Sequence, residues 1–170
     1  MSNGSRAAAL PITAIASELL EYDPLTGVMR WRVFRRGNAP AGAEAGWIEK
    51  GRRRVEIDYK VYLVHRVAYY LHTGEQPPQF LDHRDGDALN NRFANLRPAT
   101  RRQNNRNKGT YANNTSGHKG VMYRAEMSKY VARIGYNGRK KHLGVFDTLD
   151  EAVAAYQSAA KSLYGDFLRQ

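Results

Sequence analysis

The chain has 170 residues, of which 42% are hydrophobic, so we expect a folded protein of one ordinary domain or two small ones. Its formal net charge of +11 favours a polyanionic partner, with nucleic acid first and an anionic membrane second. Cysteine is absent, which excludes disulfides, thiolate zinc sites and thiol catalysis. A metal site would have to use His, Asp, Glu or Asn, and these ligands favour a hard ion such as Mg²⁺ or Mn²⁺.

The N-terminal residues loosely imitate a signal peptide, because Arg6 precedes an alanine-rich run. Pro11 interrupts that run, and its basic region is a single residue. No apolar run reaches the length that spans a membrane. We therefore expect an intracellular protein with no membrane partner, and a secreted protein is the alternative.

Hydrophobic periodicity predicts short elements in the first part of the chain. In chain order these are a helix over 13–22, a strand over 28–33, a hairpin of strands over 52–58 and 61–64, and an amphipathic helix over 64–72. Gly74 is expected to end that last helix, and Pro77-Pro78 prevents its resumption.

A second hairpin is expected around a polar loop that spans 84–94, with strands over 80–82 and 96–99. Thr100 and Gln103 have the spacing of a capping box, in which each side chain bonds the backbone of the other residue. The sequence therefore predicts a helix over 101–107, which places Asn104 in its first turn.

The C-terminal part has a different pattern, with three strands followed by one helix. Asn137-Gly138 is a strong hairpin signal between the second and third strands, because both residues tolerate positive φ. Thr148 and Glu151 form another capping box, and Gly165 stops the helix that follows. We predict an α+β protein with three parts: residues 1–108, a linker over 109–115, and a small domain over 116–168.

Three residues around the second hairpin suit phosphodiester chemistry. Asp82 and Asn104 offer oxygen atoms that could hold one divalent ion. His83 is the residue type that takes a proton from water near neutral pH. The alternative is that an Asp-His pair in a loop rich in Asn and Asp only forms turns through its own backbone.

Four motifs carry a family resemblance: Asp82-His83-Arg84-Asp85-Gly86, Asn90-Asn91, Asn95-Leu96-Arg97 and Asn104. Together they resemble the HNH (ββα-metal) nuclease motif of phage and homing endonucleases. The resemblance implies His83 as general base, Asp82 and Asn104 as ligands of one Mg²⁺ or Mn²⁺ ion, and Asn95 as the brace of the loop. It also implies a bacterial or phage-infected cell. We expect Asn90 and Asn91 to be turn residues and His65 to be structural.

The C-terminal part carries a second resemblance, through Gly120-Val121-Met122-Tyr123, Lys129 to Ile134, Lys141 to Thr148 and Glu151 to Tyr156. These motifs are similar to the plant ethylene-response (APETALA-type) DNA-binding domain, which lays a three-stranded sheet in the major groove. Gln157 and Tyr130 depart from the plant pattern. The residues that we expect to contact DNA are Arg124, Arg133, Arg139, Lys140 and Lys141; the alternative for each is a solvated basic surface.

The sequence therefore predicts an endonuclease that cuts double-stranded DNA, acts as a monomer or homodimer, and leaves 5′-phosphate and 3′-hydroxyl ends. Its fold would be a ββα-metal core with a small N-terminal sheet, followed by a three-stranded antiparallel sheet and one helix. The first alternative is a DNA-binding regulator without catalysis on the same scaffold. A second alternative, allowed by charge alone, is an RNA-binding protein.

Overall fold

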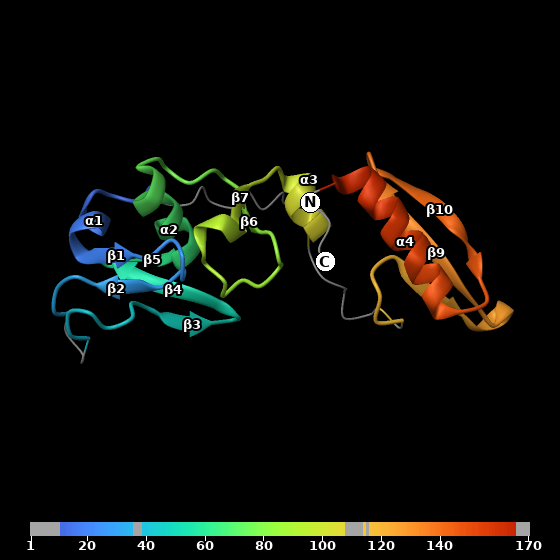
Figure 1. Ribbon diagram of the computed structural model, residues 1–170, viewed down its shortest axis with the longest axis horizontal. Helices are drawn as coiled ribbons and strands as arrows, with labels where there is room; N and C mark the ends of the chain where they lie inside the picture. Colours follow the sequence, from blue (N-terminus) through green and yellow to red (C-terminus); the bar gives the residue numbers. More distant parts are fainter. Residues whose placement is uncertain (1–10, 36–38, 108–113, 115, 166–170) are drawn as a thin grey trace, which may run out of the picture. The chain divides into compact units, whose positions relative to one another are not determined.

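A computed structural model describes residues 11–35, 39–107, 114 and 116–165 of the chain. The chain forms two compact units, Met1–Asn104 and Asn105–Gln170, whose elements are labelled in Figure 1. The units are built from short helices and small antiparallel sheets, which confirms the predicted α+β class. Apart from Asn114, the expected linker over 109–115 lies outside the described residues. No described helix is long and apolar enough to cross a membrane.

The first unit contains three small antiparallel sheets, formed by β1–β2, β3–β4–β5 and β6–β7. Its elements, in chain order, are α1 (Ile15–Leu19), β1 (Leu20–Tyr22), β2 (Met29–Trp31), β3 (Trp47–Glu49), β4 (Arg52–Ile57), β5 (Lys60–Leu63), α2 (Val64–Thr73), β6 (Leu81–His83), a 3₁₀ turn (Phe93–Asn95) and β7 (Leu96–Pro98). Helix α3 (Arg101–Asn107) follows and continues past the boundary of the unit.

The core of the first unit forms around helix α2. Its buried face presents Val64, Val67 and Ala68, which join one cluster with Val55 and Ile57 of β4. These positions follow the helical spacing of one apolar face, so burial of that face explains why the segment is a helix. The helix ends as predicted, at a glycine in the left-handed conformation.

The prediction of one helix over 13–22 is wrong for its last three residues. Helix α1 ends at Leu19, and residues Leu20–Tyr22 form strand β1, in which Leu20 lies opposite Trp31. The extended chain lets Leu20 enter the core with 1% exposure while its backbone pairs with β2. Local periodicity does not report a partner strand, so the sequence pattern favoured the helix.

The β6–β7 hairpin and helix α3 follow the predicted order. The capping box at the start of α3 is present in both directions. The Thr100 backbone N–H donates to Oε1 of Gln103 at 2.7 Å, and the Gln103 N–H donates to Oγ1 of Thr100 at 3.2 Å. This pair satisfies two of the backbone donors that a helix start leaves without partners within the helix.

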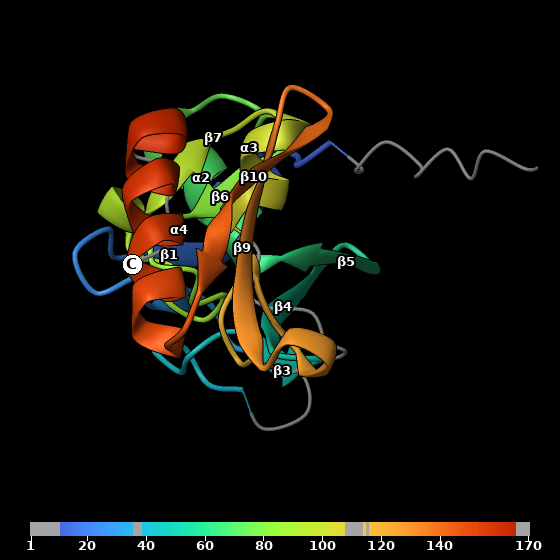
Figure 2. The same ribbon diagram turned by 90° about the vertical axis from the view of Figure 1, so that its right-hand side faces the viewer.

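The second unit contains the three strands and one helix expected from the sequence. Its elements are β8 (Val121–Arg124), a 3₁₀ turn (Ala125–Met127), β9 (Lys129–Tyr136), β10 (Arg139–Phe146) and α4 (Leu149–Tyr164). The strands form an antiparallel sheet in the order β10-β9-β8, and α4 covers one face of it (Figures 1 and 2). Val121, Ala132 and Ile134 of the sheet meet Ala152 and Ala160 of α4 in a buried cluster.

Candidate active site

Strands β6 and β7 carry the predicted metal ligand and the predicted base. In the antiparallel register, Asp82 lies opposite Arg97 and His83 lies opposite Leu96. Asp82 and His83 are buried, with 6% and 5% exposure. The strand ends at His83, whose backbone oxygen accepts from the Gly86 N–H at 3.0 Å. The chain therefore turns away directly after the Asp-His pair.

Asp82 forms a buried ion pair with Arg97. Both Nε and Nη2 of Arg97 donate to Oδ2 of Asp82, at 3.2 and 3.0 Å. The two side chains are only 6% and 7% exposed. A buried carboxylate needs compensating charge and hydrogen bonds, and the opposite strand supplies both.

His83 lies in an environment that favours its neutral form. Burial lowers the pKa of His83 below its usual value of 6.5, and the positive charge of Arg52 acts in the same direction. The hydrogen bond with Asn91 and the carboxylates of Asp85 and Asp82 oppose this change of the pKa without reversing it. A neutral imidazole at pH 7 is able to accept a proton from water.

Two further side chains contact the His83 ring. Nε2 of His83 lies 3.3 Å from Oδ1 of Asn91. The ring of His65, on α2, meets it edge-on, with centroids 4.9 Å apart and planes at 72°. Burial and the neighbouring His83 push the pKa of His65 well below its usual value. Asn91 was expected to be only a turn residue, but it is 3% exposed and contacts the predicted base.

Asn95 joins the two ends of the loop between the strands. Its Nδ2 donates to Oδ1 of Asp85 at 3.0 Å and to the backbone oxygen of Asn90 at 2.8 Å. Its Oδ1 accepts from the Asp85 N–H at 3.1 Å. Asp85 also accepts from the Asp87 N–H at 2.8 Å. These contacts fix the loop after His83, which is what a loop brace requires.

Asn104 lies in helix α3, and its backbone N–H donates to the Thr100 oxygen at 2.9 Å. Its side chain is half-buried. Among the described residues, no group of three or more His, Asp or Glu side chains is arranged to hold a metal ion. The expected donors, the Asp82 carboxylate and the Asn104 amide, are hard oxygen ligands. They fit Mg²⁺ or Mn²⁺ with water in the remaining positions.

The five expected DNA contacts lie on two different faces of the C-terminal sheet. Lys141 is paired with Ile134, and Arg139 with Tyr136. Directly opposite residues share a face, so these two cations lie on the face of buried Ile134, which α4 covers. Residues that alternate with them lie on the open face: Arg124, Arg133 and Lys140.

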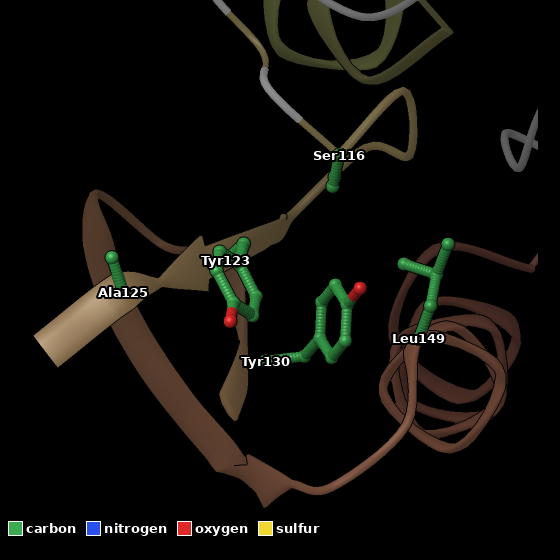
Figure 3. A pocket seen from close by; sticks show the side chains of 5 residues that line it. All are labelled: Ser116, Tyr123, Ala125, Tyr130 and Leu149. Carbon is green, nitrogen blue, oxygen red and sulfur yellow. The ribbon is translucent and has the colours of Figure 1, made fainter. Parts of the chain in front are cut away.

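A pocket of about 440 Å³ lies at the covered face of the same sheet. Figure 3 shows Tyr123 and Tyr130 side by side, with Leu149 of α4 across from them. The two rings have centroids 5.1 Å apart. None of the described residues that line the pocket is charged, and the Ser116 hydroxyl donates to the Val121 oxygen at 2.7 Å. The pocket therefore lacks the acid and base groups found around β6.

Comparison with known proteins matches residues 62–106 to a family model described as HNH endonuclease. An uncharacterized HNH endonuclease of Acanthamoeba polyphaga mimivirus is 34% identical over 115 residues, which cover 66% of this chain and 59% of that protein. Protein 3.8 of Escherichia phage T7 is 33% identical over 90 residues, which cover 53% of this chain and 74% of that protein. The chain therefore contains an HNH endonuclease family domain. No solved structure gives a significant match.

The match confirms the predicted HNH endonuclease domain. The matched segment contains the whole β6–β7 hairpin and Asn104, and it ends before the C-terminal sheet. The resemblance of that sheet to an ethylene-response domain therefore stays a prediction. The chain spans little more than half of the mimivirus relative, 59% of its length.

Sequence reasoning missed two residues of this HNH endonuclease site. Arg97 could have been found, because pairing the predicted strands over 80–82 and 96–99 in antiparallel register puts it near Asp82. Asn91 carried no such signal, since its contact with His83 depends on the path of an irregular loop. Arg52 affects the pKa of His83 from another sheet, a relationship that no local pattern reports.

Proposed function

We propose that this protein is a metal-dependent endonuclease that hydrolyses phosphodiester bonds in double-stranded DNA. His83 acts as the general base, Asp82 and Asn104 hold one Mg²⁺ or Mn²⁺ ion, and β6, β7 and α3 form the ββα-metal core. The observation that carries the proposal is the environment of His83. The side chain is a buried imidazole with a lowered pKa, directly after a buried carboxylate, within the segment matched to HNH endonucleases.

The chain's own residues support hydrolysis by in-line attack of water. His83 is neutral at pH 7 because burial lowers its pKa, so it takes the proton of the attacking water. Asn95 keeps the loop after His83 in place through its contacts with Asp85 and Asn90. Arg97 holds the Asp82 carboxylate in one position. A rigid arrangement of this kind contributes to rate because the reacting groups need no reorganisation.

Asp82 and Asn104 would hold a divalent ion, which would supply positive charge to stabilise the transition state and the leaving 3′ oxygen. The products would carry 5′-phosphate and 3′-hydroxyl ends. As a monomer the enzyme would nick one strand, whereas a homodimer with two sites would cut both. Its place of action would be the cytoplasm of a bacterial or phage-infected cell, and one of the relatives is a protein of Escherichia phage T7.

We further propose that the C-terminal sheet binds DNA in the major groove through its open face. The major groove of DNA admits a two-stranded β-ribbon, so two neighbouring strands of the sheet could enter it. The open face carries Arg124, Arg133 and Lys140, while α4 covers the other face. Arg139 and Lys141 would then contact only backbone phosphate at the margin of the sheet.

The test is a nicking assay on supercoiled plasmid with Mg²⁺, with Mn²⁺ and with chelator. We expect cleavage with a divalent ion, none with chelator, and a loss of at least about 100-fold in His83→Ala, as for removal of a general base. His118→Ala is the matched control, because His118 is exposed and lies in the second unit. DNA binding without cleavage in the presence of every metal would contradict the proposal that the protein is an enzyme. Undiminished cleavage by His83→Ala would contradict the proposal that His83 is the general base.

One observation favours a second candidate, a DNA-binding regulator without catalysis. The Asp82 carboxylate already has a cationic partner in Arg97, so its negative charge is compensated within the protein. The two candidates differ in a simple result. The regulator would bind plasmid in a salt-dependent way and leave it supercoiled, whereas the enzyme would convert it to nicked or linear forms.

A further inference from the structure

The side chain of Asn91 presents its amide oxygen to Nε2 of His83. Nδ2 of Asn91 donates to the Leu89 oxygen at 3.1 Å, so Oδ1 is the atom that faces Nε2 of His83 at 3.3 Å. An amide oxygen accepts hydrogen bonds and cannot donate them, so Nε2 of His83 is the donor in this contact. In the neutral ring Nδ1 is then the basic nitrogen, and it is the one suited to accept a proton from water.

The backbone of Asn91 is held in turn by strand β1. The hydroxyl of Tyr22 donates to the Asn91 oxygen at 2.7 Å, across 69 positions of sequence. Burial, with a smaller contribution from Asp23, raises the pKa of Tyr22 to about 12, so the hydroxyl remains a donor over the whole range in which proteins are usually assayed. Tyr22 lies outside residues 62–106, which the family model matches.

The turn between β1 and β2 packs against the same segment. Gly27 has φ of 78°, and a Cβ added there would lie 2.6 Å from the Asn91 carbonyl carbon and 2.5 Å from the Arg92 nitrogen. Beside it, the Phe93 N–H donates to the Pro24 oxygen at 3.0 Å. The hairpin therefore touches three successive residues of the loop, through one side chain and two stretches of backbone.

We propose that the β1–β2 hairpin and Asn91 form a positioning device for the general base. Tyr22 fixes the backbone of Asn91, and the Asn91 amide fixes the orientation and tautomer of the His83 ring. The inference rests on the proposed function, in which His83 is the base. Asn91 and Tyr22 are positioning residues, because they act through His83 and not on DNA. The inference also gives the N-terminal hairpin, outside the matched segment, a part in the reaction.

The experiment separates this role from general support of the loop. Three variants test the contacts: Asn91→Ala removes the amide with its contacts to His83 and Leu89, Asn91→Asp keeps an acceptor oxygen for His83 but loses the donor to Leu89, and Tyr22→Phe removes only the hydroxyl. Tyr59→Phe is the matched control, since Tyr59 is 94% exposed. Two measurements are needed for each variant. They are the single-turnover rate of plasmid cleavage with Mn²⁺ and the DNA dissociation constant in the presence of chelator. Nitrogen-15 spectra of the metal-free protein report the tautomer of each histidine.

We expect His83 of the unaltered protein to show the Nε2–H tautomer and Asn91→Ala to show a mixture. Cleavage by Asn91→Ala should fall about 10–100-fold, the usual effect of removing a group that orients a catalytic ligand. The DNA dissociation constant should stay within about twofold, because no DNA contact is lost. Asn91→Asp should recover most of the rate at about pH 8.5, where the imidazole is neutral. Tyr22→Phe should lose about 2–10-fold, as for one hydrogen bond.

Cleavage by Asn91→Ala at the unaltered rate would overturn the inference, and so would a tautomer mixture in the unaltered protein. If Asn91→Ala does not fold, Asn91→Asp and Tyr22→Phe decide by the same two readouts. Failure of the unaltered protein to cut DNA with any metal would contradict the proposed function instead. The tautomer spectra would then still show whether Asn91 orients the His83 ring.

Discussion

Arg97 and Asp82 face each other across the β6–β7 hairpin and form a buried ion pair, in which two guanidinium nitrogens donate to one carboxylate oxygen. The residue expected to ligate a cation is thus already held by a cation of the protein. This pairing explains how a carboxylate with 6% exposure is tolerated before metal binds. It also means that Arg97 positions the Asp82 carboxylate and would compete with a metal ion for it.

Replacing Arg97 by Leu should destabilise the protein strongly. The substitution leaves the Asp82 carboxylate buried without its guanidinium, and breaking a buried pair from one side typically costs about 3–5 kcal/mol. Urea unfolding without metal measures the loss. Arg53→Leu is the control, because its partner Glu44 is 45% exposed and surface pairs contribute about 0–1 kcal/mol. Equal losses of unfolding free energy in the two variants would show that the buried Asp82 pair contributes no more to stability than an exposed pair.

Acid should destabilise the metal-free protein through its two buried imidazoles. The folded-state pKa of His65 and of His83 lies below 6.5, chiefly through burial, so the unfolded chain binds more protons as pH falls below about 6.5. Stability therefore decreases from about pH 6.5 down to the folded pKa, by up to about 1.4 kcal/mol per pH unit for each histidine.

Unfolding by urea at several pH values checks this dependence. His65→Gln should flatten the slope between pH 6.5 and 5, because one of the two depressed imidazoles is removed. His118→Gln should keep the full slope, since His118 is exposed. A variant slope as steep as that of the unaltered protein would mean that His65 does not contribute.

Sequence signals predicted the elements whose cause is local. The capping box at Thr148 and Glu151 starts α4 as expected, with both side-chain contacts made. Asn137 and Gly138 adopt the positive φ values, 49° and 78°, that the turn requires. Helix α4 then ends at Gly165. In each case two to four neighbouring residues contain the physical cause, so no distant partner had to be known.

The remaining features depend on partners far away in the chain. Strand β1 forms because Leu20 pairs with Trp31, and Tyr22 meets Asn91 only after both segments are folded. The Asp-His pair and Asn104 were proposed from their residue types and spacing, and their roles stay predictions. Pairing of the predicted strands could have placed Arg97 near Asp82, whereas Asn91 resembles an ordinary turn residue in sequence, and only the folded loop shows its burial.

Arg133 and Lys141, both expected to contact DNA, lie on opposite faces of the C-terminal sheet. Arg133→Ala, on the open face, should weaken DNA binding about 5–150-fold if it contacts a base, or reduce the salt slope by about one if it contacts phosphate. Lys141→Ala, on the face of Ile134, should weaken binding less, and by the same factor for every DNA sequence, as for loss of one backbone contact. Binding measured over a series of salt concentrations distinguishes these results. A larger effect of Lys141→Ala would mean that DNA approaches the opposite face.

The capping box of α3 should affect metal binding. Thr100→Ala removes the side-chain acceptor of the Gln103 N–H, and loss of such a cap costs about 0.5–2 kcal/mol. Because Asn104 lies in this first turn, we expect cleavage to require a higher Mn²⁺ concentration. Thr148→Ala removes the equivalent cap of α4. It should lower stability by a similar amount and leave the Mn²⁺ requirement unchanged. Identical Mn²⁺ titrations for the two variants would contradict a connection between the cap of α3 and metal binding by Asn104.

Gly27 gives the sharpest steric test of the contact between the β1–β2 turn and the loop. Gly27→Ala places a methyl group 2.5 Å from the backbone nitrogen of Arg92, where neither backbone can yield easily. The positive φ of 78° adds about 1–2 kcal/mol of strain for an L-residue. We expect the loop to shift, stability to fall by more than about 2 kcal/mol, and cleavage to decrease with the displacement of Asn91.

Gly42→Ala separates strain from collision. Gly42 has φ of 85°, and a Cβ added there meets nothing within 4 Å, so only the conformational penalty of about 1–2 kcal/mol applies. Its single-turnover cleavage rate should equal that of the unaltered protein at a temperature where both are folded, whereas that of Gly27→Ala should be reduced. If the two variants lose stability equally and cleave equally, the close approach of Gly27 to the loop does not matter for the base.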